Sequence, residues 1–374
     1  MELANLSQRR PIVLVINSAE IGGAEKQLVR LAGEMKSKGV RVEVFFMLSG
    51  GPLTVELDKY SIPWRNFNIQ IREHRFRSLL NAIRMGVFLR KLNPIVINAW
   101  LFECAAATFI IASVFSPGSL RIASFRGHPH KVKKGLRILF SKVFRMADGV
   151  ICNAQHLADG VVSTFNVDPS KIRIIRNGVD IPEHLAKVAS QPPTAVVVAN
   201  FHKYKGHEIL LESLVLTAPS LNVRLCGGGR ERESIGNLVQ DLGLDNSVTL
   251  VSEPANVGHE IAQAQFAIHP SLTEGMSNAI LEEISVGLPV VAFDIPGNNS
   301  LVIDNVTGLL VKPGDAKEMA KAIAYLASDP GARSRMSLKA RDHAKNFDWD
   351  SCARNYEKYL SYLIKNKKYP RKLL

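Results

Sequence analysis

The chain of 374 residues lacks an apolar run of the roughly 18 to 20 residues that a membrane-spanning helix requires. Its first ten residues contain Glu2, Arg9 and Arg10 and lack the apolar centre of a secretory signal. Cysteine is also scarce and shows no metal-ligand spacing. The four cysteines lie in or beside apolar runs: Cys104, Cys152, Cys226 and Cys352. We therefore expect reduced thiols that pack in the interior of a cytosolic protein.

Acidic residues are fewer than basic residues. The 47 Lys and Arg residues against 34 Asp and Glu give a formal net charge of +13. A basic protein attracts anionic partners, such as phosphorylated ligands, nucleic acids or an acidic membrane face. No recognised nucleic-acid-binding module is present, and the basic residues show no pattern of interleaved aromatic residues. We therefore expect no nucleic-acid partner.

The pattern of strands and helices predicts a doubly wound α/β protein. Ile12 to Ile16 and Val40 to Met47 are apolar strand-like runs, and the amphipathic stretch from Ala24 to Lys38 lies between them. Such a βαβ unit implies parallel strands with a right-handed crossover. The alternation continues to Ile175 and resumes at Thr194. Ligands of such sheets bind outside the carboxyl ends of the strands.

The length suits two domains rather than one core. Pro182 to Pro193 contains Gln191-Pro192-Pro193 and is the expected linker. The expected domains are therefore residues 1–188 and 193–348, followed by a helical segment that begins at Trp349.

The most informative stretch runs from Pro270 to Glu283. It follows the strand-like run from Phe266 to His269, and Gly287 ends the helix that follows. Three residues lie where that helix begins, so free backbone N–H groups and the positive end of the helix dipole form an anion site. These residues are Gly275, Ser277 and Asn278.

Two carboxylates flank this anion site. Glu274 lies just before it, and Glu282 lies about two helical turns further on. Eight residues at roughly 100° each place the two on different faces, so they do not form an acid/base pair. They suit vicinal hydroxyls at opposite ends of a ligand whose phosphates lie between them, as in a nucleotide sugar. Taken alone, this spacing is a chance match most of the time, in an ordinary strand–loop–helix unit with two solvated glutamates.

The surrounding sequence decides between these interpretations. The stretch continues with Gly287-Leu288-Pro289-Val290-Val291-Ala292-Phe293-Asp294-Ile295-Pro296-Gly297-Asn298 and then Thr307-Gly308-Leu309-Leu310-Val311. Together these motifs resemble the signature of retaining glycosyltransferases of the GT-B fold, specifically family 4. The resemblance implies two Rossmann-like domains that face a central cleft, with the segment 349–374 packing back on the first domain.

The same resemblance assigns roles to individual residues. It implies that Glu274 holds the hydroxyls of the donor sugar, that Lys205 binds the diphosphate, and that Glu282 binds the ribose. Backbone N–H groups of Gly275, Met276 and Ser277 would face the sugar or the phosphates. The further donor-binding candidates are Gly22, Gly23, Asn200, Gly228, Arg230 and Asn278.

This chain departs from the family pattern at two places. The family has an arginine five or three residues before the lysine, where this chain has Asn200 and His202. The second phosphate contact is therefore open among Lys203, His202 and Arg230. In the first domain, Arg126 stands where many relatives have histidine. It suits a phosphate or a sugar hydroxyl and cannot be a general base.

His128 lies two residues later and is a second catalytic candidate, although a loop histidine is more often structural.

The sequence thus predicts a retaining glycosyltransferase that uses a UDP- or GDP-sugar. The implied acceptor is a lipid-linked glycan of a bacterial surface polysaccharide, such as lipopolysaccharide, O-antigen or capsule. Fixed cations and helix N-termini can stabilise the leaving diphosphate without a metal ion, so we expect metal-independent transfer and no cofactor. The alternatives are an epimerase or hydrolase of the same fold, and a non-catalytic protein that binds sugar nucleotides or membranes.

Two basic segments favour contact with an anionic membrane. They are residues 72–77 and 130–145, and the second pairs its cations with an apolar face. That face comprises Leu136, Leu139, Phe140, Val143 and Phe144. The alternative is a helix whose apolar face packs on the sheet. We expect a cytoplasmic protein that lies peripherally on the inner face of the cell membrane.

Overall fold

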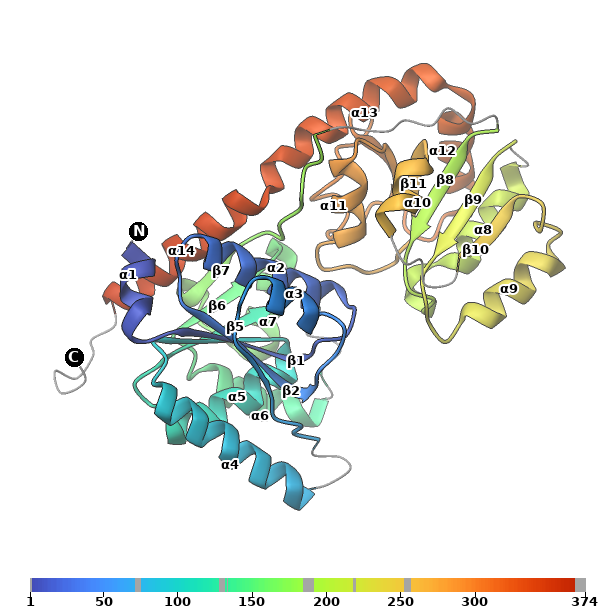
Figure 1. Cartoon of the computed structure of the whole chain (residues 1–374). Helices are drawn as coiled ribbons and strands as arrows, with labels where there is room; N and C mark the ends of the chain where they lie inside the picture. The colour runs from blue at the N-terminus through green and yellow to red at the C-terminus, as the bar shows by residue number, and fades with distance from the viewer. Residues whose placement is uncertain are drawn as a thin grey trace. The chain divides into compact units, whose positions relative to one another are not determined.

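The computed structural model describes residues 2–70, 75–127, 132, 134–183, 192–217, 220–251 and 257–366. The chain divides into two compact units (Figure 1). The first comprises Met1–Gly178 and Trp349–Leu374, and the second comprises Val179–Asp348. The chain therefore leaves the first unit earlier than residue 188, where the sequence analysis placed the boundary. The two crossings lie side by side, because Val179 pairs with Asp348 and its N–H donates to Phe347 O at 2.9 Å.

The first unit is built on a parallel sheet of seven strands in the order β3-β2-β1-β4-β5-β6-β7. The strands are β1 (Ile12–Ser18), β2 (Val42–Ser49), β3 (Trp64–Asn66), β4 (Val96–Trp100), β5 (Leu120–Phe125), β6 (Gly149–Cys152) and β7 (Ile172–Ile174). The central strands are almost wholly buried, which explains why they read as continuous apolar runs.

Helices cover both faces of this sheet. One face is covered by α4 (Arg75–Leu92), α5 (Phe102–Phe115), α6 (Lys134–Phe144) and α7 (Gln155–Phe165). The other is covered by α1 (Glu2–Arg9), α2 (Gly23–Ser37), α3 (Thr54–Lys59) and α14 (Trp349–Asn366). Helices α1 and α3 and strand β3 were not predicted, because each is too short to show a clear period.

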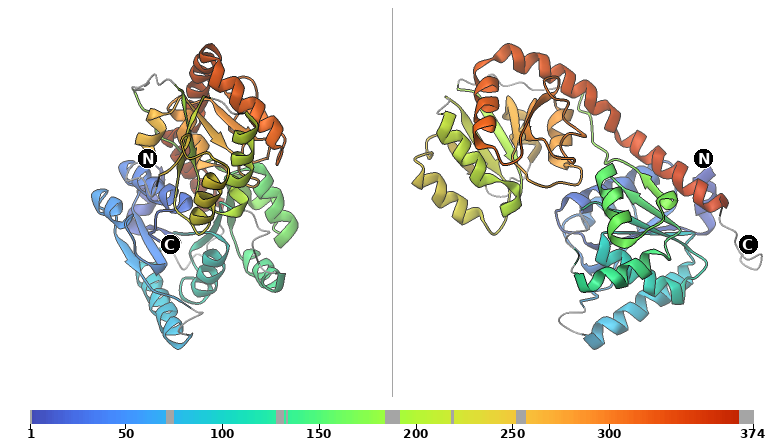
Figure 2. Two further views of the ribbon diagram at one scale, coloured as in Figure 1. Left: turned by 90° about the vertical axis from the view of Figure 1, so that its right-hand side faces the viewer. Right: turned by 180° about the vertical axis from the view of Figure 1, so that it is seen from behind.

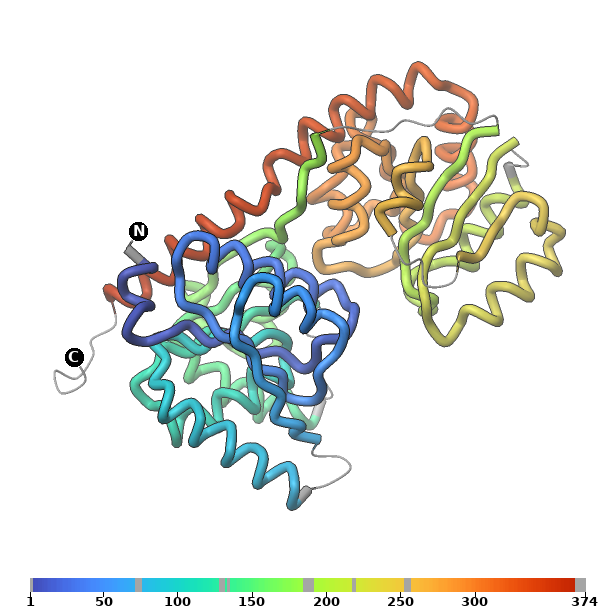
Figure 3. The backbone as a smooth tube through the Cα atoms, in the orientation of Figure 1, coloured from blue at the N-terminus to red at the C-terminus, as the bar shows by residue number. Residues whose placement is uncertain are grey.

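The returning helix α14 completes the core of the first unit. Its Tyr356 and Leu360 are fully buried, and they belong to the same cluster as Leu3 of α1. Figure 3 shows the first and last helices of the chain side by side. Gly178 is required here, because a Cβ atom at this position would lie 2.4 Å from the Trp349 ring.

The second unit has a parallel sheet of six strands in the order β10-β9-β8-β11-β12-β13. They are β8 (Thr194–Val198), β9 (Asn222–Cys226), β10 (Val248–Val251), β11 (Phe266–His269), β12 (Val290–Phe293) and β13 (Gly308–Val311). One face packs on α8 (His207–Thr217), α9 (Arg232–Asp241) and α12 (Ala316–Ser328). The other packs on α10 (Val257–Gln263), α11 (Asn278–Ser285) and α13 (Pro330–Ala344). Two doubly wound sheets confirm the predicted α/β architecture.

Two further expectations can be compared with the structure. The four cysteines are buried free thiols, so their predicted packing role is confirmed. The apolar face predicted for residues 130–145 is divided: Phe140, Val143 and Phe144 pack into the core, as in the alternative interpretation, whereas Leu136 and Leu139 are exposed. Residues 72–74, 130, 131 and 133 of the two basic segments lie outside the described residues. None of the described helices is long and apolar enough to cross a bilayer.

The core of the second unit contains one uncompensated acid. Glu283 of α11 is fully buried, and neither carboxyl oxygen has a hydrogen-bond partner among the described residues. Burial raises the pKa of Glu283 well above its usual value, and the neighbouring Glu282 raises it further. Folding therefore favours the neutral form of this carboxyl.

This acid should make stability depend on pH. The pKa of Glu283 is higher in the folded than in the unfolded chain. The contribution of Glu283 to the free energy of unfolding is therefore highest at low pH, and it falls as the pH rises from the unfolded pKa toward the folded pKa. We expect Glu283→Gln to raise Tm, with a gain that grows between pH 5 and pH 8. Thermal unfolding across that range measures this, with Glu212→Gln on the exposed side of α8 as control. A gain that does not change with pH would contradict a neutral Glu283.

Candidate active site

The predicted anion-binding loop joins β11 to α11. Helix α11 begins at Asn278, and Ser277 is its N-cap, whose Oγ accepts a hydrogen bond from Ile280 N at 3.3 Å. Gly287 ends the helix in the left-handed conformation, with φ of 78°. Both ends of the helix therefore lie where the sequence predicted them.

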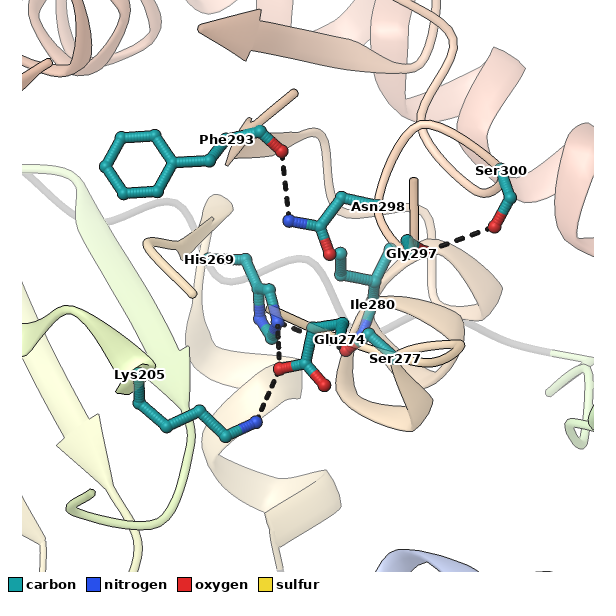
Figure 4. A network of polar contacts seen from close by, with 9 residues as sticks. All are labelled: Lys205, His269, Glu274, Ser277, Ile280, Phe293, Gly297, Asn298 and Ser300. Carbon is teal, nitrogen blue, oxygen red and sulfur yellow. Dashed lines mark hydrogen bonds and ion pairs between the residues drawn. The ribbon is translucent and has the colours of Figure 1, made fainter. Parts of the chain in front are cut away.

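A buried ion pair lies at the carboxyl end of β11. Lys205 Nζ is 2.5 Å from Glu274 Oε1, and only 15% and 13% of these side chains are exposed. His269, the last residue of β11, places its Nε2 3.2 Å from the same oxygen. Figure 4 shows the lysine and the histidine converging on one carboxylate. The structure thus brings together two of the predicted site residues, Lys205 and Glu274.

These contacts keep Glu274 ionised. Burial alone would raise the pKa of Glu274, but the hydrogen bond with His269 and the charge of Lys205 outweigh it and lower the pKa to about 2. For His269, burial lowers the pKa, and the hydrogen bond and charge of Glu274 act in the opposite direction. The site therefore combines a carboxylate, an ammonium group and a neutral imidazole.

The hydrogen bonds fix the tautomer of His269. A carboxylate only accepts hydrogen bonds, so the proton must be on Nε2. Ser277 Oγ lies 3.2 Å from the same nitrogen and shares this contact. The other ring nitrogen, Nδ1, is buried and has no partner among the described residues, so a proton there would be unpaired. His269 is a donor that orients Glu274.

Sequence reasoning missed His269. Its signal was a polar residue at the end of the otherwise apolar run Phe266–His269, where ligands of parallel sheets bind.

The loop before α8 holds Lys205 against Glu274. Residues Lys203–Lys205 form a 3-10 turn that ends at Gly206, with φ of 73°. Tyr204 O accepts a hydrogen bond from Leu272 N at 2.9 Å, which fastens this turn to the Glu274 loop. Gly206 lies so close to Pro270 that a Cβ atom would be 2.0 Å from its carbonyl oxygen. The position of Lys205 thus depends on the absence of a side chain at residue 206.

A second loop, which follows β12, packs against the backbone of Glu274 and Gly275. A Cβ atom at Gly297 would lie 2.7 Å from Glu274 Cβ and 2.8 Å from Gly275 O. The next residue, Asn298, is fully buried, and its Nδ2 donates to Phe293 O at 3.0 Å (Figure 4). The motif Pro296-Gly297-Asn298 therefore shapes the loop that carries the carboxylate.

The other predicted residues of α11 and its loop lie in different surroundings. The Met276 side chain packs in the core, so only its backbone can serve a ligand. Glu282 lies in the middle of α11 and is partly exposed, as are Gly275 and Asn278.

The glycine-rich segment after β9 packs against the neighbouring loop. A Cβ atom at Gly227 would lie 2.2 Å from Ala199 O, and one at Gly229 would lie 2.7 Å from Phe201 O. Gly228 O accepts a hydrogen bond from Phe201 N at 2.7 Å. These glycines therefore allow the loops that follow β8 and β9 to pack closely against each other. Asn200 and Arg230 are both exposed, and Arg230 Nε pairs with Glu231 at 3.2 Å.

In the first unit, Gly22 and Gly23 lie at the start of α2, as predicted. Gly22 is the N-cap and offers no side chain for capping. The Glu25 carboxylate covers this position, since a Cβ atom on Gly22 would be 2.2 Å from its Oε2. Burial raises the pKa of Glu25, and a backbone hydrogen bond partly offsets this. An acid thus lies beside the backbone N–H groups of this helix end.

Arg126 is held by groups of the first unit. Its Nη1 donates to Asn177 Oδ1 at 2.6 Å, its Nη2 donates to the Tyr356 hydroxyl, and its guanidinium lies 4.2 Å from the Trp100 ring centre. These contacts fix the cation and also link α14 to β5. His128, the other predicted catalytic residue of this unit, lies outside the described residues.

The close approach at Gly206 gives a direct test of the site's framework. Gly206→Ala would force both a positive φ and a backbone clash, whereas Gly243→Ala would force only the positive φ of 66°, because no atom lies within 4 Å of its Cβ. We expect about 1–2 kcal/mol of destabilisation for Gly243→Ala and clearly more for Gly206→Ala. Denaturant unfolding measures both. Equal losses would show that the Pro270 contact is not tight.

Two family models match successive parts of the chain. The model described as Glycosyltransferase Family 4 matches residues 21–183, and that described as Glycosyl transferases group 1 matches residues 180–343. Together they extend over most of both units.

Two relatives match most or part of the chain. The lipopolysaccharide core biosynthesis glycosyltransferase LpsE of Rhizobium meliloti is 24% identical over 343 residues, which cover 86% of this chain and 90% of the relative. An N-acetylgalactosamine-N,N'-diacetylbacillosaminyl-diphospho-undecaprenol 4-alpha-N-acetylgalactosaminyltransferase of Campylobacter jejuni is 26% identical over 229 residues. That match covers 60% of this chain and 63% of the relative, which is less than two thirds of its length.

Solved structures match almost the whole chain. A glycosyltransferase from Rickettsia africae has a TM-score of 0.81 at 18% identity, covering 96% of this chain and 100% of that one. HepE of Anabaena, in complex with UDP and glucose, has a TM-score of 0.83 at 21% identity, covering 94% and 99%. At these identities the likeness shows the fold alone, which confirms the predicted GT-B class. With both family models matched in sequence order, the chain belongs to glycosyltransferase family 4.

Proposed function

We propose that the protein transfers a hexosyl or N-acetylhexosaminyl group from a nucleotide-diphosphate sugar to an acceptor, with retention of configuration. The observation that carries the proposal is the buried Lys205–Glu274 pair at the carboxyl end of β11. A fixed cation and a fixed carboxylate beside a helix N-terminus suit a ligand that has both a diphosphate and a hydroxylated ring.

Each group of the site has a distinct task in this proposal. Lys205 neutralises the diphosphate as the glycosidic bond breaks, and Glu274 accepts hydrogen bonds from the hydroxyls of the donor sugar. Backbone N–H groups at the start of α11 face the sugar or the phosphates, and Glu282 binds the ribose.

The remaining predicted donor contacts are Gly22, Gly23, Asn200, Gly228 and Arg230. Arg126, as a contact to a phosphate or a sugar hydroxyl, and His128 remain the catalytic candidates of the first unit.

In the proposed reaction, the nucleoside diphosphate is the leaving group. The bond between the anomeric carbon and the phosphate oxygen breaks, and the acceptor oxygen bonds to the same face of that carbon. The acceptor's proton passes to the departing phosphate, so no enzymic nucleophile is needed. The fixed charge of Lys205 takes the place of a metal ion in this scheme.

The donor and acceptor classes are supported by the relatives. The fold is shared with a protein that was solved with UDP and glucose, which favours a UDP-sugar over a GDP-sugar. The names of two relatives refer to lipopolysaccharide core synthesis and to a diphospho-undecaprenol acceptor. We propose a lipid-linked glycan as acceptor, and action at the cytoplasmic face of the cell membrane.

Sugar transfer can be tested in two stages. A panel of UDP- and GDP-sugars should contain one that raises Tm, because a ligand that binds the native state stabilises it. With that donor and a lipid-linked acceptor, Lys205→Ala and Glu282→Ala should each lower kcat/KM by about 10²–10³. Lys317→Ala and Glu212→Ala, on exposed positions of the same unit, are the controls. Donor consumption without transfer, or near-normal rates in both site variants, would contradict the proposal.

The hydrogen bond from His269 predicts a change in pH dependence. Without it, the pKa of Glu274 should rise from about 2, because burial is no longer offset by that donor. Activity that needs the carboxylate would then fall at a higher pH on the acidic side. We expect this shift in His269→Leu, and a smaller one in His269→Gln, which keeps an N–H donor. The kcat/KM profile between pH 4 and pH 8 measures it, and an unchanged acidic limb in His269→Leu would contradict the role of His269.

A further inference from the structure

Exposed apolar side chains gather on three consecutive helices of the first unit. Ten large apolar residues of α4, α5 and α6 are between 39% and 76% exposed. They are Phe76, Leu79, Leu80, Ile83, Val87, Ile110, Val114, Leu136, Ile138 and Leu139. We call this set the outer apolar face. Patches of this kind on a soluble domain mark sites of interaction.

Helix α4 contributes most of this face because it is apolar on two sides. Ser78, Met85 and Leu89 point into the core. Phe76, Leu80, Ile83 and Val87 follow one another at intervals of four, three and four residues, which aligns them along the opposite side. A helix that only packed on the sheet would carry polar residues there.

Helices α5 and α6 extend the face. Ile110 and Val114 are four residues apart on α5, and Ile138 of α6 is 71% exposed. Helices α4 and α5 pack closely, since a Cβ atom at Gly86 would lie 2.3 Å from the Phe115 ring. All three helices cover the same side of the sheet, and α4 lies on the outside of the unit in both views of Figure 2.

The charge on these helices is almost entirely positive. Their sequences contain eight lysines and arginines, and Glu103 is the single acid. Arg77, Arg84 and Lys91 are exposed at seven-residue intervals, which places them in a stripe beside the apolar stripe of α4. Arg90 of α4 and Lys142 of α6 are exposed as well.

We propose that the outer apolar face docks on the surface of a bilayer that contains anionic lipids. Apolar side chains enter the interface between headgroups and acyl chains, while the flanking cations meet the negative headgroups. The inference rests on the proposed function for its purpose, since a lipid-linked acceptor is presented at such a surface. Its physical basis is independent of the site in the second unit.

The charge argues against a second copy of the chain as the occupant. Two copies that met through this face would bring together sixteen cations and two acids, whereas acidic headgroups complement them.

Vesicle sedimentation tests the proposal with the full-length protein. The vesicles are phosphatidylcholine alone or phosphatidylcholine with phosphatidylglycerol. We expect binding that requires phosphatidylglycerol and weakens as salt is added. Phe76→Ser/Ile83→Ser and Arg84→Glu/Lys91→Glu should each lower the partition coefficient about tenfold or more.

Matched variants on exposed positions of the second unit serve as controls. They are Tyr325→Ser/Leu338→Ser and Lys321→Glu/Lys339→Glu, and both should bind vesicles as the unaltered protein does. Equal binding to the two kinds of vesicle, or equal losses in the control variants, would overturn the proposal. So would a dimer, seen by ultracentrifugation, that Phe76→Ser/Ile83→Ser dissociates.

Thermal stabilisation by the donor separates this inference from the proposed function. The two double variants of the outer apolar face, which bind vesicles weakly, should keep the Tm shift caused by the donor. They should lose transfer to an acceptor in vesicles. A protein that binds vesicles as expected but no sugar nucleotide would refute the proposed function while leaving the docking surface intact.

Discussion

The candidate site depends on the ion pair between Lys205 and Glu274. Taking two charges out of water costs several kcal/mol per ion, so such a pair persists only where further hydrogen bonds compensate it. Here His269 donates to the same carboxylate, and Ser277 contacts the ring of His269. The arrangement fits a site in which the partners of the two charges are exchanged for a ligand, because the lysine can turn to a phosphate and the carboxylate to sugar hydroxyls without either becoming unpaired.

The scaffold gains its precision from close backbone contacts. Gly206 lies against Pro270, and Gly297 lies against Glu274, so that three loops of one sheet edge fix two side chains. These loops all follow the carboxyl ends of parallel strands, where helix N-termini also meet. In the first unit, by contrast, the informative feature is a surface. Its helices α4 and α6 carry cations without acids, and α4 presents apolar residues to solvent.

Much of this could be predicted from the sequence. The strand Phe266–His269, the helix start at Ser277 and the helix end at Gly287 follow from local patterns, and Lys205 and Glu274 from motif resemblance. The role of His269 could not be predicted, because its contacts depend on where the 203–206 turn packs. The outer face of α4 was missed because its exposed apolar residues look like core residues in a sequence. For residues 130–145 the sequence left both interpretations open, because it does not show that Phe140, Val143 and Phe144 pack into the core while Leu136 and Leu139 stay exposed.

The central claim is that Lys205 and Glu274 bind the diphosphate and the sugar of a nucleotide sugar. A crystal structure of the protein with the nucleotide sugar that stabilises it most is the direct measurement. The account predicts that the diphosphate lies within hydrogen-bond distance of Lys205 Nζ and the start of α11, with a sugar hydroxyl on Glu274. A nucleotide sugar bound elsewhere, with the ion pair intact, would contradict it.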